Sequence, residues 1–316
     1  MSTRYGVGGN RIGWADLPEP LRCALTERLG AAIVDEASQP GGFSPGLAAR
    51  LRLADGRRVF VKAVGTQRNP HSPGMHRREI EILRALPPGL PVPTLLDSYD
   101  DGDWVALIIT DIDGVPPALP WRARELGEVL TALGALHQRL TPSPIATATF
   151  ADTHPETSGR WHEFADNPVG ADQLPDWATD HLDLLVELES GAVQASRGDT
   201  LLHCDLRADN VLRTEAGTVF VDWPHACTGA AWIDLAAFLP SVGMQGGPDP
   251  EIVWQHAIGS SADPDRVNAV LAGIAGFFLV SALQPPPPNL PTIRTFQRLQ
   301  GDVTLGWLRQ RLRLHR

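Results

Sequence analysis

The sequence predicts an α+β protein of two lobes: a small N-terminal lobe built on an antiparallel sheet with one crossing helix, and a larger, mainly helical C-terminal lobe. Two observations predict this class. Short β-branched and aliphatic runs separated by tight turns fill the first third of the chain, whereas apolar patterns of helical period fill the rest. The segment Asp111-Ile112-Asp113-Gly114, followed by two prolines, marks the boundary, so we expect lobes at 1–113 and 114–316.

Composition narrows the class of protein. The chain has 316 residues, 43% of them hydrophobic and 20% charged, which suffices for a core and excludes global disorder. Its net charge of −10 has the wrong sign for a nucleic-acid partner, whose phosphates need a basic surface. Residues 1–10 lack the apolar run of a signal peptide, and the apolar stretch Val267 to Leu283 is shorter than the about 20 residues of a spanning helix. We therefore expect a cytoplasmic protein with no nucleic-acid or membrane partner, and a buried helix at 267–283; the sequence does not specify an oligomeric state.

The three cysteines are Cys23, Cys204 and Cys227. They form no CxxC pair, which argues against a disulfide framework and a structural zinc site and fits a reducing compartment. Cys204 follows His203, but consecutive residues of an extended segment point to opposite sides, so we expect no thiol mechanism.

The N-terminal lobe has five predicted strands and two predicted helices. The strands cover residues 31–37, 47–53, 57–64, 92–99 and 104–110, and the helices cover 17–29 and 72–86. A glycine-rich turn at 39–46 separates the first two strands. Ala54-Asp55-Gly56 is a strong hairpin signal between the next two.

The C-terminal lobe is predicted to be mainly helical, at residues 121–140, 176–195, 231–239, 250–258, 266–283 and 291–314. Four prolines at 285–288 form a stiff link before the last helix. Two short β-type runs, Val211 to Arg213 and Thr218 to Val221, predict a hairpin ahead of the last four helices.

Lys62 is the only lysine among 27 basic residues, and it lies on the predicted strand at 57–64. Arginine has taken nearly every other basic position. A surface charge can be either residue, but a compact ammonium that contacts a phosphate as a point charge is not replaced by a planar guanidinium. Lys62 is therefore either a chance survivor or a phosphate-binding residue.

The predicted hairpin brings together two oxygen-bearing side chains. Asn210 directly precedes its first strand and Asp222 directly follows its second, and the open ends of a hairpin lie side by side. An amide oxygen and a carboxylate suit a hard cation such as Mg²⁺, which shares its ligands with phosphate oxygens. Asp205 lies five residues before Asn210, close enough to act as a base at the same centre. Taken singly, each of these residues is more typical of a turn or a cap.

The pattern His203-x-Asp205-x-x-x-x-Asn210, with Asp222 12 residues further on, resembles the signature of the aminoglycoside phosphotransferase and choline kinase-like family. That family is similar in fold to the protein kinases, so the resemblance implies a bilobal protein-kinase-like fold. It extends to three N-terminal motifs and one later motif, over about residues 31–240. These are Gly41-Gly42-Phe43-Ser44 (nucleotide loop), Val59-Phe60-Val61-Lys62 (lysine strand), Arg77-Arg78-Glu79 (acidic helix) and Gly229 to Ala236 (the segment after the metal aspartate).

The resemblance implies a role for each residue of the motif. Asp205 would be catalytic, accepting the proton of the substrate hydroxyl or holding that hydroxyl in line. Asn210 and Asp222 would hold Mg²⁺ against the nucleotide phosphates. Lys62 would contact the α- and β-phosphates and pair with Glu79. This is the logic of phosphoryl transfer by positioning and charge neutralisation.

Five further residues would bind the nucleotide, which is ATP, with GTP as the alternative. Gly41, Gly42 and Ser44 would cover the phosphates through backbone N–H groups and the Ser44 hydroxyl. Asp111 and Ile112 would belong to the hinge beside the adenine, where backbone groups matter more than side chains.

Three residues in or beside these motifs have competing interpretations. Glu79, rather than Glu81, shares a helix face with apolar residues at i+3, i+4 and i+7, so we predict that Glu79 is the partner of Lys62. Arg207, which we expect to be exposed, would either stabilise γ-phosphate charge or pair with Asp209, and we favour the pairing. Asp234, at a helix start, would cap that helix or brace the catalytic loop.

The sequence thus predicts a Mg²⁺-dependent small-molecule kinase. The acceptor is an aminoglycoside-like antibiotic or another sugar- or nucleoside-type molecule; macrolides and choline-like amines fit as well. A cationic acceptor would suit the acidic segment 150–190, whose other interpretation is a solvated surface. Its acids are Asp152, Glu156, Glu163, Asp166, Asp172, Asp176, Asp180, Asp183, Glu187 and Glu189.

Two other functions compete with this one. A pseudokinase acting as a nucleotide-binding interaction module is the alternative, but the five expected catalytic groups are all present. A protein kinase is disfavoured because only 12 residues separate Asp222 from Asp234, which leaves no room for a long activation loop.

Overall fold

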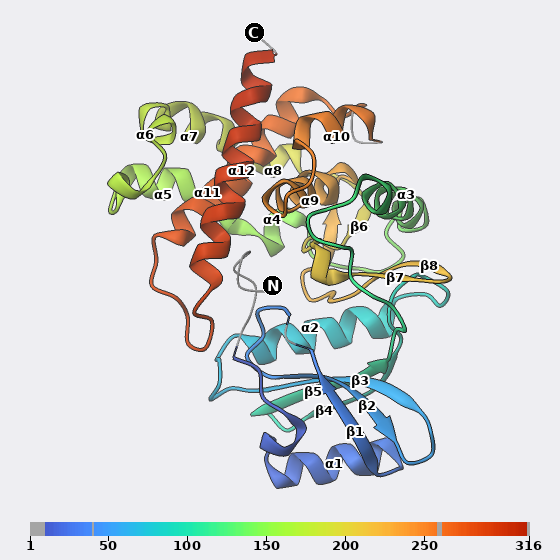
Figure 1. Ribbon diagram of the computed structural model, residues 1–316. Coiled ribbons are helices and arrows are strands. Elements are labelled where there is room, and N and C mark those ends of the chain that lie inside the picture. The colour runs from blue at the N-terminus through green and yellow to red at the C-terminus, as the bar shows by residue number, and fades with distance from the viewer. Residues whose placement is uncertain (1–9, 40, 258–260, 315–316) are drawn as a thin grey trace. The chain divides into compact units, whose positions relative to one another are not determined.

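The computed structural model describes residues 10–39, 41–257 and 261–314, which divide into two compact units (Figure 1). The first unit comprises the described residues up to Val115 together with 212–225 and 286–293. The second comprises 116–211, 226–285 and the chain from 294 onward. One unit carries an antiparallel sheet and the other is larger and mainly helical, so the predicted α+β class is confirmed.

The first unit is built on a five-stranded antiparallel sheet with the strand order β1-β2-β3-β5-β4. Its strands are β1 (Ile33–Ser38), β2 (Leu47–Leu53), β3 (Arg58–Gly65), β4 (Leu95–Asp100) and β5 (Trp104–Thr110). Gly56 in the β2–β3 turn has φ 89°, a left-handed conformation that glycine adopts without strain. The predicted hairpin at 54–56 is confirmed.

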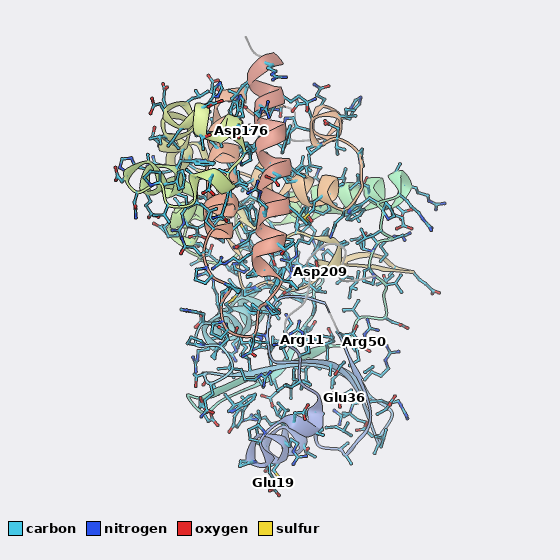
Figure 2. All side chains as sticks on the ribbon, turned by 60° about the vertical axis from the view of Figure 1, so that its left-hand side comes forward. Arg11, Glu19, Glu36, Arg50, Asp176 and Asp209 are labelled. Atoms are coloured by element: carbon cyan, nitrogen blue, oxygen red, sulfur yellow. The ribbon has the colours of Figure 1, made fainter. Side chains whose placement is uncertain are left out.

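The two faces of this sheet carry different side chains. Leu47, Ala49 and Leu51 of β2 pack in one core with α1 (Glu19–Leu29). Because side chains alternate along a strand, Arg50 points to the opposite face, where α2 (Ser72–Ala85) lies against β3 and β5. Figure 2 shows Arg50 on one side of the sheet and Glu19 of α1 on the other. This alternation puts Lys62 of β3 on the α2 face.

The second unit contains α3 to α12 and the two-stranded β6–β9 sheet. The helices are α3 (Ala123–Arg139), α4 (Phe150–Thr153), α5 (Arg160–Asp166), α6 (Asp176–Asp180), α7 (Leu182–Ser190), α8 (Ala192–Ala195), α9 (Trp232–Met244), α10 (Pro250–His256), α11 (Pro264–Ala282) and α12 (Ile293–Leu314). β6 covers Thr200–Leu202 and β9 covers Cys227–Gly229. β7 (Val211–Thr214) and β8 (Gly217–Phe220) form the predicted hairpin, which belongs to the first unit from residue 212 onward.

Helix α11 belongs to the hydrophobic core of the second unit, where its leucines pack with Trp161 and Trp307. It is the one helix of the described residues that is long and apolar enough to cross a membrane, and 72% of its apolar window is buried inside the protein. Gly273 allows a close approach, since a Cβ there would lie 1.9 Å from the Thr157 carbonyl oxygen. The predicted buried helix at 267–283 is confirmed.

One predicted helix is wrong in detail. Residues 176–195 form three short helices, α6 to α8, instead of one. The chain leaves helical geometry at His181, whose φ is −123° and whose ring stacks on Trp177 with centroids 4.4 Å apart. The helical period continues through the break, so the pattern of apolar residues did not indicate it.

Candidate active site

Lys62, Glu79 and Asp222 form an ionic cluster inside the first unit. The Lys62 Nζ donates to both carboxylate oxygens of Glu79 at 2.8 Å and to Asp222 Oδ1 at 2.7 Å. β3 supplies the lysine, α2 supplies the glutamate, and the chain supplies the aspartate just after β8. The predicted pairing with Glu79 is observed, while Glu81 is exposed.

The cluster carries one positive and two negative charges at the edge of the core. The Glu79 side chain is 1% exposed, that of Lys62 is 14% exposed and that of Asp222 is 33% exposed. Burial works to lower the pKa of Lys62, but the carboxylates of Asp222 and Glu79 outweigh it and raise the pKa. Burial raises the pKa of Glu79, which Lys62 only partly offsets. The net charge of −1 therefore favours a further cation beside Asp222, the most exposed member.

The backbone at Asp222 is held in an uncommon conformation. Its φ is 72°, in the left-handed region that few residues other than glycine adopt. The next residue, Trp223, is fully buried; its backbone N–H donates to Glu79 Oε1 at 3.4 Å and its Nε1 to the Phe220 carbonyl at 2.9 Å. Neighbouring bonds thus impose the conformation, a pattern found at functional sites.

The glycine-rich loop contains an unsatisfied hydroxyl and a nearby cation. Ser44 Oγ is buried and has no hydrogen-bond partner among the described residues. Arg11 Nη2 donates to the Gly41 carbonyl at 2.5 Å, and a Cβ at Gly42, whose φ is 80°, would lie 2.8 Å from that nitrogen. The loop therefore presents a positive charge and a hydroxyl. The sequence did not predict a role for Arg11, because it lies 30 residues before Gly41 and belongs to no recognisable motif.

The predicted hinge follows β5 directly. The Asp111 carboxylate is 1% exposed and pairs with Arg58 Nη2 at 2.6 Å and with Arg50 Nε at 3.4 Å. The Ile112 carbonyl accepts from the Gly114 N–H at 2.9 Å. The Asp111 side chain therefore fixes the end of the sheet, consistent with a hinge whose backbone matters more than its side chains.

The catalytic-loop motif lies in the second unit, between β6 and β7. Asp205 Oδ2 accepts from Asn210 Nδ2 at 3.0 Å, and the same nitrogen donates to the Asp205 carbonyl at 2.7 Å. Asn210 ends the 3₁₀ turn η5 (Ala208–Asn210). Since both bonds use the amide nitrogen, the amide oxygen of Asn210 is the atom that can bind a cation.

Arg207 is buried in this loop, so its predicted exposure is wrong. Its Nη1 donates to Asp205 Oδ1 at 2.9 Å, and its Nε and Nη2 donate to the two Asp209 oxygens at 3.0 and 3.2 Å. Its guanidinium also lies over the Phe296 ring, 5.5 Å from the centroid. Two carboxylates and a ring therefore cover a side chain that its sequence neighbours suggested was solvated. The favoured pairing with Asp209 is observed.

Asp234 holds the start of the same loop. Its buried carboxylate accepts from the backbone N–H groups of His203 at 2.9 Å and Cys204 at 2.8 Å, and it bonds His137 Nε2 at 2.9 Å. Burial acts to raise the pKa of Asp234, but the contacts with His137 and His203 outweigh it and lower the pKa. His203 Nδ1 in turn accepts from the Asp205 N–H at 3.2 Å. Asp234 therefore braces the loop, one of its two predicted roles, whereas His137 was not predicted.

The acidic segment divides into structural and exposed acids. Glu189 is buried and accepts from the N–H groups of Trp161 and His162 at the start of α5, and Glu156 lies 3.6 Å from His154. The other eight acids are exposed. Figure 2 places Asp176 on α6, away from Asp209 of the catalytic loop. This favours a solvated surface for at least that part of the segment.

The oxygen donors fit a hard divalent cation. Asp222 offers a carboxylate and Asn210 an amide oxygen, the ligand types that Mg²⁺ and Ca²⁺ prefer. The β7–β8 hairpin connects the two residues in the chain. The chain therefore contains the groups that phosphoryl transfer by positioning and charge neutralisation requires: a buried Lys–Glu pair, an aspartate after a hairpin, and a loop that holds an aspartate and an asparagine.

The chain belongs to the phosphotransferase enzyme family, whose pattern it matches over residues 44–270. The predicted family and the predicted phosphotransferase class are thereby confirmed. No curated protein matches the chain in sequence.

Solved structures with the same fold are distant in sequence. The aminoglycoside phosphotransferase APH(3'')-Id from Streptomyces rimosus, solved with ADP and streptomycin, is 18% identical with a TM-score of 0.51, covering 81% of this chain and 98% of that one. The amicoumacin kinase hAmiN, solved with AMP-PNP, Ca²⁺ and Ami, is 11% identical with a TM-score of 0.52, covering 92% and 95%. A choline/ethanolamine kinase family protein from Mesorhizobium loti is 15% identical with a TM-score of 0.56, covering 91% and 99%. The protein-kinase-like fold is thereby confirmed.

Proposed function

We propose that this phosphotransferase moves the γ-phosphate of ATP to a hydroxyl group of a small molecule, with Mg²⁺ as the metal. The observation that carries the proposal is the buried Lys62–Glu79–Asp222 cluster, in which the only lysine of the chain is held between two carboxylates. A surface ion pair would not need a lysine, a buried glutamate and a left-handed aspartate together.

In this proposal the residues of the first unit bind the nucleotide. The Lys62 ammonium contacts the α- and β-phosphates while Glu79 fixes its position. The N–H groups of Gly41 and Gly42 and the Ser44 hydroxyl cover the phosphates, and the unsatisfied Ser44 Oγ supports this role. The backbone of Asp111 and Ile112 lies beside the adenine.

Asp222 and Asn210 hold the metal, which supplies charge neutralisation of the transferring phosphate when bound. The net charge of −1 on the ionic cluster supports a cation at Asp222. Among the similar structures, one was solved with ADP and one with AMP-PNP and Ca²⁺, which supports a nucleotide and a divalent cation here.

Asp205 accepts the proton of the acceptor hydroxyl, or holds that hydroxyl in line. Its carboxylate is fixed by Arg207 and Asn210, so little reorganisation is needed when the acceptor binds. We propose an aminoglycoside-like antibiotic, or another sugar- or nucleoside-type molecule, as the acceptor. With an antibiotic as acceptor, the reaction would confer resistance. A pseudokinase is not favoured, because all five expected groups are present.

The test is nucleotide-dependent phosphate transfer by the purified chain. ATP and GTP are each offered with Mg²⁺ against aminoglycosides, macrolides, nucleoside antibiotics, choline-like amines and amino sugars. We expect one acceptor to gain the mass of a phosphate with the wild type and not with Asp205→Asn. If no acceptor reacts, Mg²⁺-ATP binding that is lost in Asp222→Ala would keep the nucleotide assignment. No nucleotide binding at all would refute it.

A further inference from the structure

His154, Cys204 and Cys227 bring a nitrogen and two sulfur atoms together inside the second unit. The ligand atoms of the three side chains all lie within 4.8 Å of one another, and the two Sγ atoms are 3.2 Å apart. None of the three residues has a role in the proposed phosphoryl transfer. The cluster needs a separate explanation.

One of the three residues lies in a strand, and the other two closely follow regular elements. Cys227 starts β9 and pairs with Leu202 of β6, and Cys204 lies two residues beyond Leu202. His154 follows α4, whose N-cap, Thr149, bridges to Thr228 of β9. The β6–β9 pair and α4 therefore hold the three side chains close together, and such support from regular elements favours a built metal site.

Cys204 occupies a backbone conformation that disfavours a side chain. Its φ is 62°, in the left-handed region where glycine carries no steric cost. Asp234 Oδ1 accepts its N–H at 2.8 Å and holds it there. A glycine would form this loop with less strain, so the thiol is present at a cost, and residues in such conformations cluster at functional sites.

We propose that His154, Cys204 and Cys227 bind one thiophilic transition-metal ion, with Zn²⁺ the best match. Two thiolates and one imidazole form a Cys₂His ligand set, which binds zinc with the fourth position open to water. Zinc bonds sulfur at about 2.3 Å in tetrahedral geometry, so two thiolates on one ion lie about 3.8 Å apart. The Sγ–Sγ distance is 3.2 Å, so the two sulfur atoms have to separate by roughly 0.6 Å to bind one ion.

Glu156 places a carboxylate beside this histidine. Its Oε1 lies 3.6 Å from His154 Nδ1, an ion-pair distance slightly longer than a hydrogen bond, and a small side-chain movement on metal binding would let it orient the imidazole through that nitrogen. The chain contains no CxxC pair, and the ligands come from positions 50 and 23 residues apart, so the site is formed by tertiary structure alone.

Spectroscopy tests the site without any assay of activity. The reduced chain is titrated with Co²⁺, whose coordination by thiolates produces a charge-transfer band, and Zn²⁺ is then added to displace it. We expect the band to saturate at one thiolate-bound Co²⁺ per chain, because the oxygen ligands Asp222 and Asn210 cannot produce it, and we expect the band to be lost in Cys204→Ser and in Cys227→Ser. Glu156→Gln should weaken binding about tenfold. Cys23→Ser is the matched control, because Cys23 is the third cysteine and is exposed; its band should be unchanged.

A second measurement on the wild type covers the case in which a variant fails to fold. X-ray absorption of the Zn²⁺-loaded chain should give two sulfur neighbours at about 2.3 Å and one histidine nitrogen at about 2.0 Å. An oxygen-only shell, a band that survives in the Cys204→Ser, Cys227→Ser double variant, or equal binding by the reduced wild type and Cys204→Ser would overturn the proposal. So would a Cys204–Cys227 disulfide that reducing agent opens without restoring Co²⁺ binding.

Discussion

The ammonium of Lys62 is shared between two carboxylates, and that geometry depends on a compact, tetrahedral donor. Its Nζ donates to Glu79 Oε1, Glu79 Oε2 and Asp222 Oδ1, with nitrogen–oxygen distances of 2.7–2.8 Å. A guanidinium is planar and longer, so it cannot place donors on the same three oxygens. The single lysine of the chain is thereby explained by the shape of its site as well as by its charge.

Replacement of this lysine by arginine should therefore impair phosphate transfer despite preserving the charge. For Lys62→Arg we expect a loss of about 10²-fold or more in kcat, the magnitude seen when one preorganised donor is removed. Steady-state kinetics with Mg²⁺-ATP measure it. Arg28→Lys is the control, since Arg28 forms an exposed pair with Asp97 at 3.4 Å and should lose nothing. A Lys62→Arg enzyme with wild-type kcat would contradict the proposed role.

His76, one turn before Glu79 on α2, should make stability depend on pH. Burial, and then the positive charge of Lys62, lower the pKa of His76 from 6.5 to about 3, with Arg11 adding to the effect and Asp222 opposing it. Below pH 6.5 the unfolded chain binds a proton at this residue and the folded chain does not. Stability is therefore lost as the pH falls from 6.5 toward 3.

Between pH 8 and pH 5 this histidine should cost about 2 kcal/mol of unfolding free energy. Denaturant unfolding of the wild type and of His76→Gln at both values measures it, and the variant should show a smaller decrease. His71→Gln, at an exposed histidine of the same region, should keep the wild-type decrease. Identical pH profiles for wild type and His76→Gln would rule the mechanism out.

At the scale of elements, the sequence predicted what periodicity and local contacts determine. The strands at 47–53 and 104–110 have the predicted ends, because alternation and flanking turns both mark them. The pairing of Glu79 with Lys62 followed from the apolar face of α2. The three-residue strands β6 and β9 are too short to show a period and were not predicted.

The contacts that the sequence could not supply join residues far apart in the chain. His137 reaches Asp234 across 97 positions, and Arg11 reaches Gly41 across 30. The His154, Cys204 and Cys227 cluster likewise has no local spacing pattern. Such pairs depend on tertiary packing, which a period of 2 or 3.6 residues does not encode.

The link between α9 and the catalytic loop gives a prediction at this scale. Asp234→Asn keeps the shape of the side chain but replaces the charged carboxylate, whose two oxygens accept hydrogen bonds from the N–H groups of His203 and Cys204, with a neutral amide. Hydrogen bonds to a charged group contribute about 1.5–3 kcal/mol, so we expect a loss of that order in unfolding free energy and a lower kcat. Asp249→Asn is the control, because Asp249 caps α10 and touches no part of the loop. Unchanged loop hydrogen exchange in Asp234→Asn would contradict the bracing role.

At the scale of the whole molecule, the first unit is assembled from three stretches of chain. The strands β1 to β5 come from the N-terminal stretch, whereas Asp222 and Trp223 come from 212–225. Trp223 is fully buried, the Phe220 N–H donates to the Pro91 carbonyl at 2.9 Å, and Val115 bridges to Arg213. The stretch 212–225 therefore contributes a buried side chain and backbone hydrogen bonds to the N-terminal stretch. The contiguous lobe expected at 1–113 stays a prediction.

An isolated fragment of residues 1–115 should consequently be unstable and unable to bind nucleotide. It retains Lys62 and Glu79 but lacks the Asp222 carboxylate and the Trp223 side chain. Truncation of a buried tryptophan alone lowers the free energy of unfolding by about 3–5 kcal/mol. A loss of that size is comparable with the whole stability of a small domain.

Circular dichroism against denaturant and Mg²⁺-ATP titration of the fragment measure both effects. A fragment extended through a flexible linker by 212–225 serves as the control and should regain part of the cooperative transition. If the 1–115 fragment unfolds as cooperatively as the full chain, the later stretch is dispensable and the assembly argued from these contacts is wrong.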